Sequence, residues 1–206
     1  AELGFSFDVV STGMILSAEQ AALVSDFCEQ SAKEGALVFV DPIMGDEGKL
    51  YNGVGEETVA HMRKMVAVAD CIVPNYTEAA YLADMPYHED MTEEEARALT
   101  IRLHEMGAKS VVVTSAKVDG ENCVVGYDGT EGEFFRIPFD LIPVRFVGTG
   151  DIFAAVMLGR LVDGVPLQES THRAMDAVRT MIDCNRDKED KYLGIPIETC
   201  LEVLDE

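Results

Sequence analysis

The sequence has no tryptophan, only seven prolines and no low-complexity tract among its 206 residues. Basic residues are also scarce, because 16 lysines and arginines face 38 aspartates and glutamates, which gives a formal net charge of −22. Nucleic acids and anionic membranes attract basic patches, so this charge argues against both as partners. No apolar run is long enough to span a membrane, and the first residues do not read as a targeting segment. We therefore expect a soluble globular protein of the cytoplasm.

The cysteines are odd in number and widely spaced: Cys28, Cys71, Cys123, Cys184 and Cys200. None of them forms a CxxC pair, which argues against a zinc site and against a disulfide framework. Free thiols fit a reducing compartment, in agreement with a cytoplasmic location. The four histidines share no spacing typical of metal ligands, so we expect structural roles for them.

Short segments rich in Val, Ile and Phe alternate with longer amphipathic segments in the first half of the chain. The short segments are predicted strands: Phe7–Thr12, Leu37–Asp41, Cys71–Pro74 and Ser110–Thr114. The longer segments are predicted helices: Ser17–Glu34, Glu56–Ala69, Thr77–Ala83 and Thr92–Met106. Thr92 and Glu95 form a plausible capping box for the last of them. Strands that alternate with helices are typical of βαβ units, so we predict an α/β fold with a parallel sheet.

The pattern changes after residue 114. Two alternating strands are predicted at Glu121–Tyr127 and Glu133–Phe139, joined by turn-forming residues, and we expect them to form an antiparallel hairpin at the edge of the sheet. Three helical patterns follow, two long and one short: Asp151–Val162, Leu167–Arg186 and Ile197–Leu204. No linker or internal repeat is visible, so we predict one domain over residues 1–206.

The segment Gly148-Thr149-Gly150-Asp151 lies directly before an apolar helix. A glycine-rich turn that opens a helix points backbone N–H groups and the positive end of the helix dipole at one place, which suits a phosphate. An acid in the first turn can act as a base for a substrate hydroxyl. The alternative is a tight turn in which Asp151 only caps the helix.

Three further polar segments follow predicted strands. Residues 41–51, DPIMGDEGKLY, contain carboxylates that suit Mg²⁺, although they could also form an ordinary polar loop. Residues 74–78, PNYTE, offer an amide and a carboxylate to a metal, or an acid to the first turn of a helix. Thr114 and Ser115 place hydroxyls after a fourth strand, where they could also be turn residues. Because ligands of open α/β sheets collect at the carboxyl ends of strands, one fold would gather these segments.

In this order, the segments DPIMGDEGKLY, VPNYTEA, VVVTSA and FVGTGDIFAA resemble the ribokinase-like superfamily, and most closely its pyridoxal kinases, from about Asp8 to Gly164. The resemblance implies a three-layer α/β/α fold with a mostly parallel sheet and an antiparallel edge hairpin. It also implies ATP-dependent phosphorylation of the 5′-hydroxymethyl group of pyridoxal, pyridoxine or pyridoxamine, by a homodimer. The family has a further N-terminal segment before the strand at Phe7, and we expect this chain to lack it.

The resemblance implies a role for each residue of the GTGD segment. Asp151 would take the proton from the hydroxymethyl group of the substrate. The backbone N–H groups of Gly148, Thr149 and Gly150 would form the anion hole for the transferring phosphoryl group. No Walker A string GxxxxGK[ST] occurs in the chain.

The resemblance also implies ATP as co-substrate and Mg²⁺ as cofactor. Asp46 and Glu78 would hold Mg²⁺, directly or through water. Asp41 would lie near a second ion, which could be a monovalent cation.

Five residues would form the nucleotide site by the same resemblance. Asn75, Thr114 and Ser115 would contact the phosphates of ATP. Tyr51 would lie in the loop that covers these phosphates, and Val147 would flank the adenine.

Two positions depart from the family pattern. Met14 stands where similar pyridoxal kinases have a tyrosine against the vitamin ring, and in this respect the chain is more similar to hydroxymethylpyrimidine kinases. Those relatives, however, usually carry Cys in place of Asp151 and lack the GDEGKLY loop. Val73 replaces a common Thr near the cation site. Two alternatives therefore stay open: a hydroxymethylpyrimidine kinase of the same fold, and a catalytically silent nucleotide-binding module.

Overall fold

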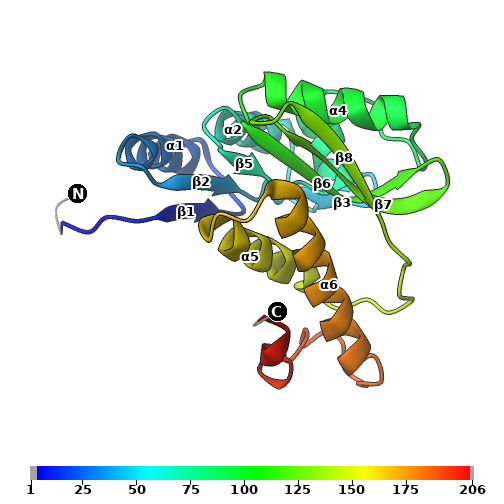
Figure 1. Cartoon of the computed structure of the whole chain (residues 1–206). Helices are drawn as coiled ribbons and strands as arrows, with labels where there is room; N and C mark the ends of the chain where they lie inside the picture. Colours follow the sequence, from blue (N-terminus) through cyan, green and yellow to red (C-terminus); the bar gives the residue numbers. More distant parts are fainter. Residues whose placement is uncertain (1–3, 205–206) are drawn as a thin grey trace. The chain divides into compact units, whose positions relative to one another are not determined.

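The structure, a computed structural model, describes residues 4–204 (Figure 1). These residues form two compact units that divide between Phe139 and Asp140. The prediction of one domain over residues 1–206 stays a prediction.

The first unit is built on a six-stranded sheet with the strand order β1-β2-β5-β6-β7-β8. Its strands are β1 (Val9–Thr12), β2 (Leu37–Val40), β5 (Cys71–Ile72), β6 (Ser110–Val118), β7 (Glu121–Asp128) and β8 (Glu133–Pro138). Neighbouring strands are parallel from β1 to β6 and antiparallel from β6 to β8. The predicted mostly parallel sheet with an antiparallel edge hairpin is therefore confirmed.

Four helices accompany this sheet: α1 (Ala18–Lys33), α2 (Glu56–Val66), α3 (Tyr76–Ala83) and α4 (Glu93–Glu105). In Figure 1, α1, α2 and α4 lie on the same side of the sheet. The core of the unit joins alternate strand residues such as Val111 and Val113 to helix residues such as Met62 and Leu103, all of them fully buried. Complete burial of one such side chain contributes about 1.5–3 kcal/mol, so this layer fixes the strand ends that carry the polar segments.

The start of α4 has the predicted capping box. The Thr92 hydroxyl accepts the N–H of Glu95 at 3.2 Å, and the Glu95 carboxylate accepts the N–H of Thr92 at 2.8 Å. Each bond satisfies a backbone donor that has no partner inside the helix.

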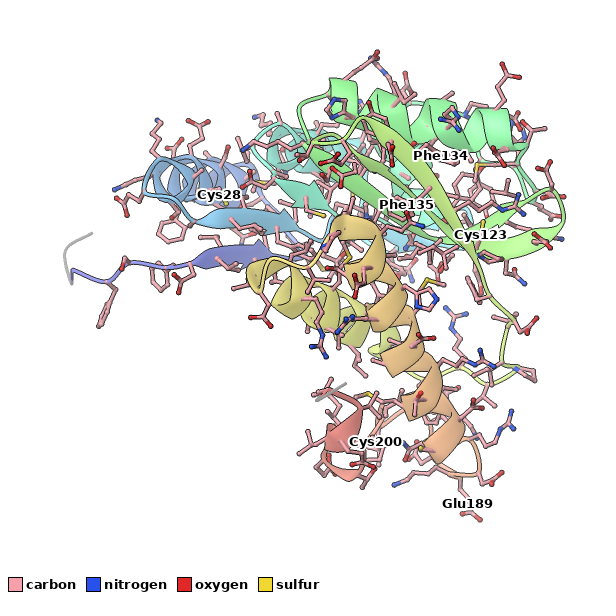
Figure 2. All side chains as sticks on the ribbon, viewed as in Figure 1. Cys28, Cys123, Phe134, Phe135, Glu189 and Cys200 are labelled. Atoms are coloured by element: carbon pink, nitrogen blue, oxygen red, sulfur yellow. The ribbon has the colours of Figure 1, made fainter. Side chains whose placement is uncertain are left out.

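One glycine in the edge hairpin of β7 and β8 leaves room for an aromatic ring. Phe135 of β8 pairs with Gly126 of β7, and a Cβ on Gly126 would lie 2.2 Å from the tip of the Phe135 ring. The neighbouring Phe134, labelled with Phe135 in Figure 2, packs instead against the core of the first unit. The Arg97 guanidinium lies 4.5 Å from the centre of the Phe134 ring. Successive residues of β8 thus point to opposite faces of the sheet, and this produces the alternating pattern from which the strand was predicted.

Two features of the first unit differ from the prediction beyond small shifts at element ends. β6 does not end at Thr114 but continues to Val118 through a bulge between Val113 and Ala116, where Ser115 has a φ of 56°. The DPIMGDEGKLY segment contains a second, two-stranded sheet of β3 (Gly45–Asp46) and β4 (Lys49–Leu50), which was not predicted because strands this short have no measurable periodicity.

The second unit consists of α5 (Thr149–Val162), α6 (Leu167–Asn185) and two 3₁₀ turns, η1 (Ile197–Thr199) and η2 (Leu201–Leu204). The two long helices agree with the prediction, whereas the predicted short helix is a pair of separate turns. Its small core includes Phe146, Ile152, Met181 and Cys200, the last of which is labelled in Figure 2.

The helices of the described residues do not combine the length and the apolar character that crossing a membrane requires. All five cysteines are free thiols, and four of them are buried.

Candidate active site

The GDEGK sequence folds into a tight hairpin after β2. β3 and β4 pair antiparallel, and the turn residues Glu47 and Gly48 have φ angles of 52° and 76°. Positive φ at both central residues is the requirement of a type I′ turn, which glycine meets without strain. Gly45 is also required, because a Cβ there would lie 2.3 Å from the carbonyl oxygen of Lys49. The hairpin places Asp46 one residue before the turn.

Glu78 joins this hairpin to the start of α3. Its Oε1 accepts the N–H of Met44 at 2.9 Å and, over a longer contact of 3.5 Å, the N–H of Gly45. Its Oε2 accepts the N–H of Asn75 at 2.8 Å. Burial raises the pKa of Glu78 to about 7; these N–H groups act in the opposite direction, and the negative charge of Asp41 adds to the rise. Both carboxylate oxygens are therefore committed to backbone donors.

Two more hydrogen bonds connect the same two segments. The Asn75 side-chain amide donates to the carbonyl oxygen of Gly45 at 2.8 Å, and the N–H of Gly48 donates to the Thr77 hydroxyl at 2.8 Å. Thr77 is a residue of this site that the sequence analysis did not identify. Its position in PNYTE, at the start of a helix, is the only feature that could have indicated it.

Thr114 and Ser115 lie beside the PNYTE segment. The N–H of Thr114 donates to the carbonyl oxygen of Pro74 at 2.9 Å, and Thr114 forms a parallel bridge with Asn75. Ser115 occupies the bulge of β6 with its left-handed φ and is exposed. The structure therefore brings three of the four predicted polar segments together within the first unit.

The remaining predicted residues of the first unit lie in the loops around this hairpin. The N–H of Asp41 donates to the carbonyl oxygen of Thr12 at the end of β1, and the N–H of Tyr51 donates to the carbonyl oxygen of Met44. Met14 follows β1 and is 47% exposed. A Cβ on the preceding Gly13 would lie 3.5 Å from the side chain of Ile43 in the DPIMG loop, so the two loops are neighbours.

The carboxylates near the β3–β4 hairpin are too few to hold a metal ion without other ligands. No group of three or more His, Cys, Asp or Glu side chains within residues 4–204 is arranged to hold a metal. Mg²⁺ usually needs only one or two carboxylates, because waters and substrate phosphates complete its octahedron. A Mg²⁺ ion in this region would therefore need water or nucleotide oxygens beside carboxylates such as Asp46 and Glu78.

The GTGD segment forms the start of α5 in the second unit. Gly148 precedes the helix with φ 85° and ψ 6°, a left-handed conformation that favours glycine. The first bond of this turn runs from the N–H of Ile152 to the carbonyl oxygen of Gly148. The N–H groups of Thr149, Gly150 and Asp151 thus have no partner inside the helix, which is the arrangement that suits an anion.

The Asp151 carboxylate lies over this turn and is exposed. A Cβ on Gly148 would lie 3.7 Å from Asp151 Oδ2. Val147, the residue before the turn, is 61% exposed, and a Cβ on Gly194 would lie 3.3 Å from its carbonyl oxygen. The second unit thus presents a carboxylate, open helix amides and an apolar side chain within one short segment.

Residues 3–194 match a family model described as phosphomethylpyrimidine kinase. The chain is 39% identical over 124 residues to a pyridoxal kinase of Arabidopsis thaliana, with 58% of this chain and 38% of the relative covered. It is 34% identical over 171 residues to a pyridoxal kinase of Sus scrofa, with 74% of this chain and 52% of the relative covered. The chain thus spans about half the length of these curated relatives, or less.

A solved structure of a Bacteroides thetaiotaomicron protein, described as a candidate phosphomethylpyrimidine kinase, is similar over the whole chain. The TM-score is 0.95 at 33% identity, with 100% of this chain and 72% of that one covered. A second crystal form of that protein was obtained with pyridoxal and gives a TM-score of 0.92 at 33% identity, with 100% and 73% covered.

Proposed function

Because the chain belongs to the phosphomethylpyrimidine kinase family and has the ribokinase-like fold of the pyridoxal kinases, we propose that its protein phosphorylates the 5′-hydroxymethyl group of a B6 vitamer with ATP. The observation that carries this proposal is the GTGD turn, in which a carboxylate lies over a helix end with open N–H groups. A base and an anion hole in one turn are what phosphoryl transfer to an alcohol requires. The pyridoxal-bound relative supports the vitamin as substrate.

Asp151 is the proposed base. Its carboxylate accepts the proton of the hydroxymethyl group, and the freed oxygen forms its bond to the γ-phosphorus of ATP while the bond from that phosphorus to the ADP oxygen breaks. The N–H groups of Gly148, Thr149 and Gly150 stabilise the negative charge on the transferring group. The protein contributes position and charge, with no covalent intermediate.

Asp46 and Glu78 are the proposed magnesium residues. Bound Mg²⁺ supplies neutralisation of the phosphate charge. Glu78 would hold the ion directly or through water, and each of its oxygens also accepts a backbone N–H. Asp46 would hold the ion from the hairpin, where its Oδ1 also accepts the N–H of Glu47 at 2.9 Å. Asp41 is assigned to a second or monovalent cation, supported by its charge effect on Glu78.

Polar groups of the neighbouring loops are the proposed contacts of the nucleotide. Asn75, Thr114 and Ser115 bind the phosphates, supported by the bridge that places the first two side by side. Tyr51 lies over the phosphates, supported by its place at the end of the hairpin. Val147 flanks the adenine, supported by its exposure beside the anion hole.

Met14 favours a second candidate function, a hydroxymethylpyrimidine kinase. Methionine is flexible and cannot donate a hydrogen bond, so this position does not demand a pyridine ring. The name of the matching family also includes a pyrimidine substrate. We further propose a cytoplasmic homodimer, which the free thiols and the family resemblance support.

The test is an assay of the full-length protein with Mg²⁺, ATP and either pyridoxal or hydroxymethylpyrimidine. We expect Asp151→Asn to lower kcat by about 10²–10⁴-fold with little change in ATP affinity, the usual contribution of a positioned base. Asp163→Asn, at the exposed end of the same helix, is the matched control and should behave as wild type. Nucleotide binding without turnover on either alcohol would favour the silent module, and full activity of Asp151→Asn would refute the base.

A further inference from the structure

Tyr87 lies in the connection between α3 and α4 and contacts the turn of the β3–β4 hairpin. A Cβ on Gly48 would lie 3.0 Å from two carbons of the Tyr87 ring, so the ring is in contact with the turn itself. Gly48 has a φ of 76°, and its N–H donates to the Thr77 hydroxyl. The turn is therefore held both by a hydrogen bond and by contact with an aromatic ring.

The Tyr87 ring is itself held in place. It stacks on Tyr76, the first residue of α3, with ring centres 4.7 Å apart and an interplanar angle of 26°. Tyr76 is 4% exposed, and its hydroxyl accepts the N–H of His88 at 3.0 Å. The buried ring fixes the half-exposed one, and the connection between α3 and α4 cannot move without disturbing the stack.

We propose that Tyr87 is a positioning residue for the magnesium–nucleotide complex. It acts through the hairpin, because its ring supports the turn that follows Asp46. This inference rests on the proposed function, in which Asp46 is the magnesium residue. Tyr87 lies between the VPNYTEA and VVVTSA segments and is not one of the site residues that the family resemblance implies.

Loss of the ring leaves the turn free to sample other conformations, which the nucleotide complex must then order. Fixing the backbone of one residue costs enough to weaken binding about tenfold. We expect Tyr87→Ala to raise the Kd and the KM of the magnesium–ATP complex about tenfold. The kcat should stay within about threefold, because the turn is ordered again once the complex is bound.

The experiment combines calorimetric binding of Mg²⁺ with a non-hydrolysable ATP analogue and steady-state kinetics of the full-length protein. Tyr87→Phe keeps the ring and should restore wild-type Kd and KM. Tyr127→Ala in β7 is the matched control, because it removes another tyrosine ring in contact with an aromatic side chain. The ring centres of Tyr127 and His104 are 4.9 Å apart, with an interplanar angle of 48°. If Tyr87 had only a structural role, Tyr87→Ala and Tyr127→Ala would lower the thermal midpoint equally, and neither would change the Kd of the magnesium–nucleotide complex.

The outcomes separate the inference from the proposed function. Wild-type Kd and KM in Tyr87→Ala, or an equal rise in Tyr127→Ala, overturns the inference alone. Failure of the unmodified protein to bind the nucleotide overturns both. A rise in Kd and KM that is confined to Tyr87→Ala and reversed in Tyr87→Phe supports the positioning role.

Discussion

Glu78 and Glu95 occupy the same place in two capping boxes and have opposite electrostatic environments. Glu95 is exposed, and the hydrogen bonds of Thr92 lower its pKa. Glu78 is 3% exposed, and burial raises its pKa to about 7, above an ordinary value of about 4.3. Between these two pH values the folded protein holds a proton at Glu78 that the unfolded chain has released. The stabilising contribution of Glu78 is therefore complete at low pH and is lost as the pH rises through about 7.

Glu78→Gln tests this sign. The difference in unfolding free energy, wild type minus Glu78→Gln, should fall by about 2–3 kcal/mol between pH 5 and pH 8, because the variant cannot titrate there. Chemical denaturation at a series of pH values measures it. Glu95→Gln is the control, because the stabilisation by Glu95 is lost only as the pH falls through its lowered pKa. The difference in unfolding free energy between wild type and Glu95→Gln should therefore not decline between pH 5 and pH 8. A flat or rising difference for Glu78 would contradict the raised pKa.

The sequence predicted the Thr92–Glu95 box but could not distinguish the two glutamates by burial. Glu78 is buried because Met44, 34 residues away in the chain, donates to it from a loop whose position depends on the sheet. The spacing Asn-x-x-Glu carries no information on such a distant partner. The polar segments could be identified from sequence, whereas the hydrogen bonds that join them required the fold.

At the scale of elements, the β3–β4 hairpin is the clearest case of a local structure that requires glycine at particular positions. Its two strands are too short to show a periodic pattern, so the sequence is equally compatible with a polar loop. The string GDEG between two apolar stretches is nevertheless a signal for a turn. The β7–β8 hairpin was predicted correctly because its strands are long enough to show alternation.

Gly45→Ala should disrupt the smaller hairpin. Its new methyl group would overlap the Lys49 carbonyl oxygen, so the backbone must shift, and we expect a loss of about 1–3 kcal/mol in unfolding free energy together with weaker magnesium–ATP binding. Gly159→Ala is the matched control, because Gly159 is exposed inside α5 with open space around it. That substitution should stabilise the protein by about 0.5–1 kcal/mol. Equal effects of the two substitutions, measured by urea denaturation and calorimetry, would contradict the steric argument.

At the scale of the whole molecule, the dominant feature is the excess of negative charge. With 38 acidic and 16 basic side chains, most carboxylates have no basic partner available. Arg136, for example, lies within 4.0 Å of the carboxylates of Glu93, Asp119 and Glu121. The composition alone predicts repulsion among the carboxylates. The grouping of several acidic residues around one arginine depends on the fold.

Salt should therefore stabilise the protein. Raising NaCl from about 10 to about 200 mM shortens the screening length and reduces the repulsion between carboxylates more than it weakens the few ion pairs. We expect the thermal midpoint to rise by about 2–4 °C, which corresponds to about 1 kcal/mol. Differential scanning calorimetry measures the midpoint, with KCl at equal ionic strength as the control for ion identity. A constant or falling midpoint would show that ion pairs outweigh repulsion.

The attachment of two loops to the single carboxylate of Glu78 has a consequence for local unfolding. The N–H groups of Met44 and Asn75 donate to the two oxygens of the Glu78 side chain. Movement of either loop away from Glu78 therefore breaks a hydrogen bond that also holds the other loop in place. The two segments therefore form one cooperative opening unit, although 29 residues separate Gly45 from the asparagine amide that donates to it. Their amide protons should exchange with solvent through the same event and report the same opening free energy.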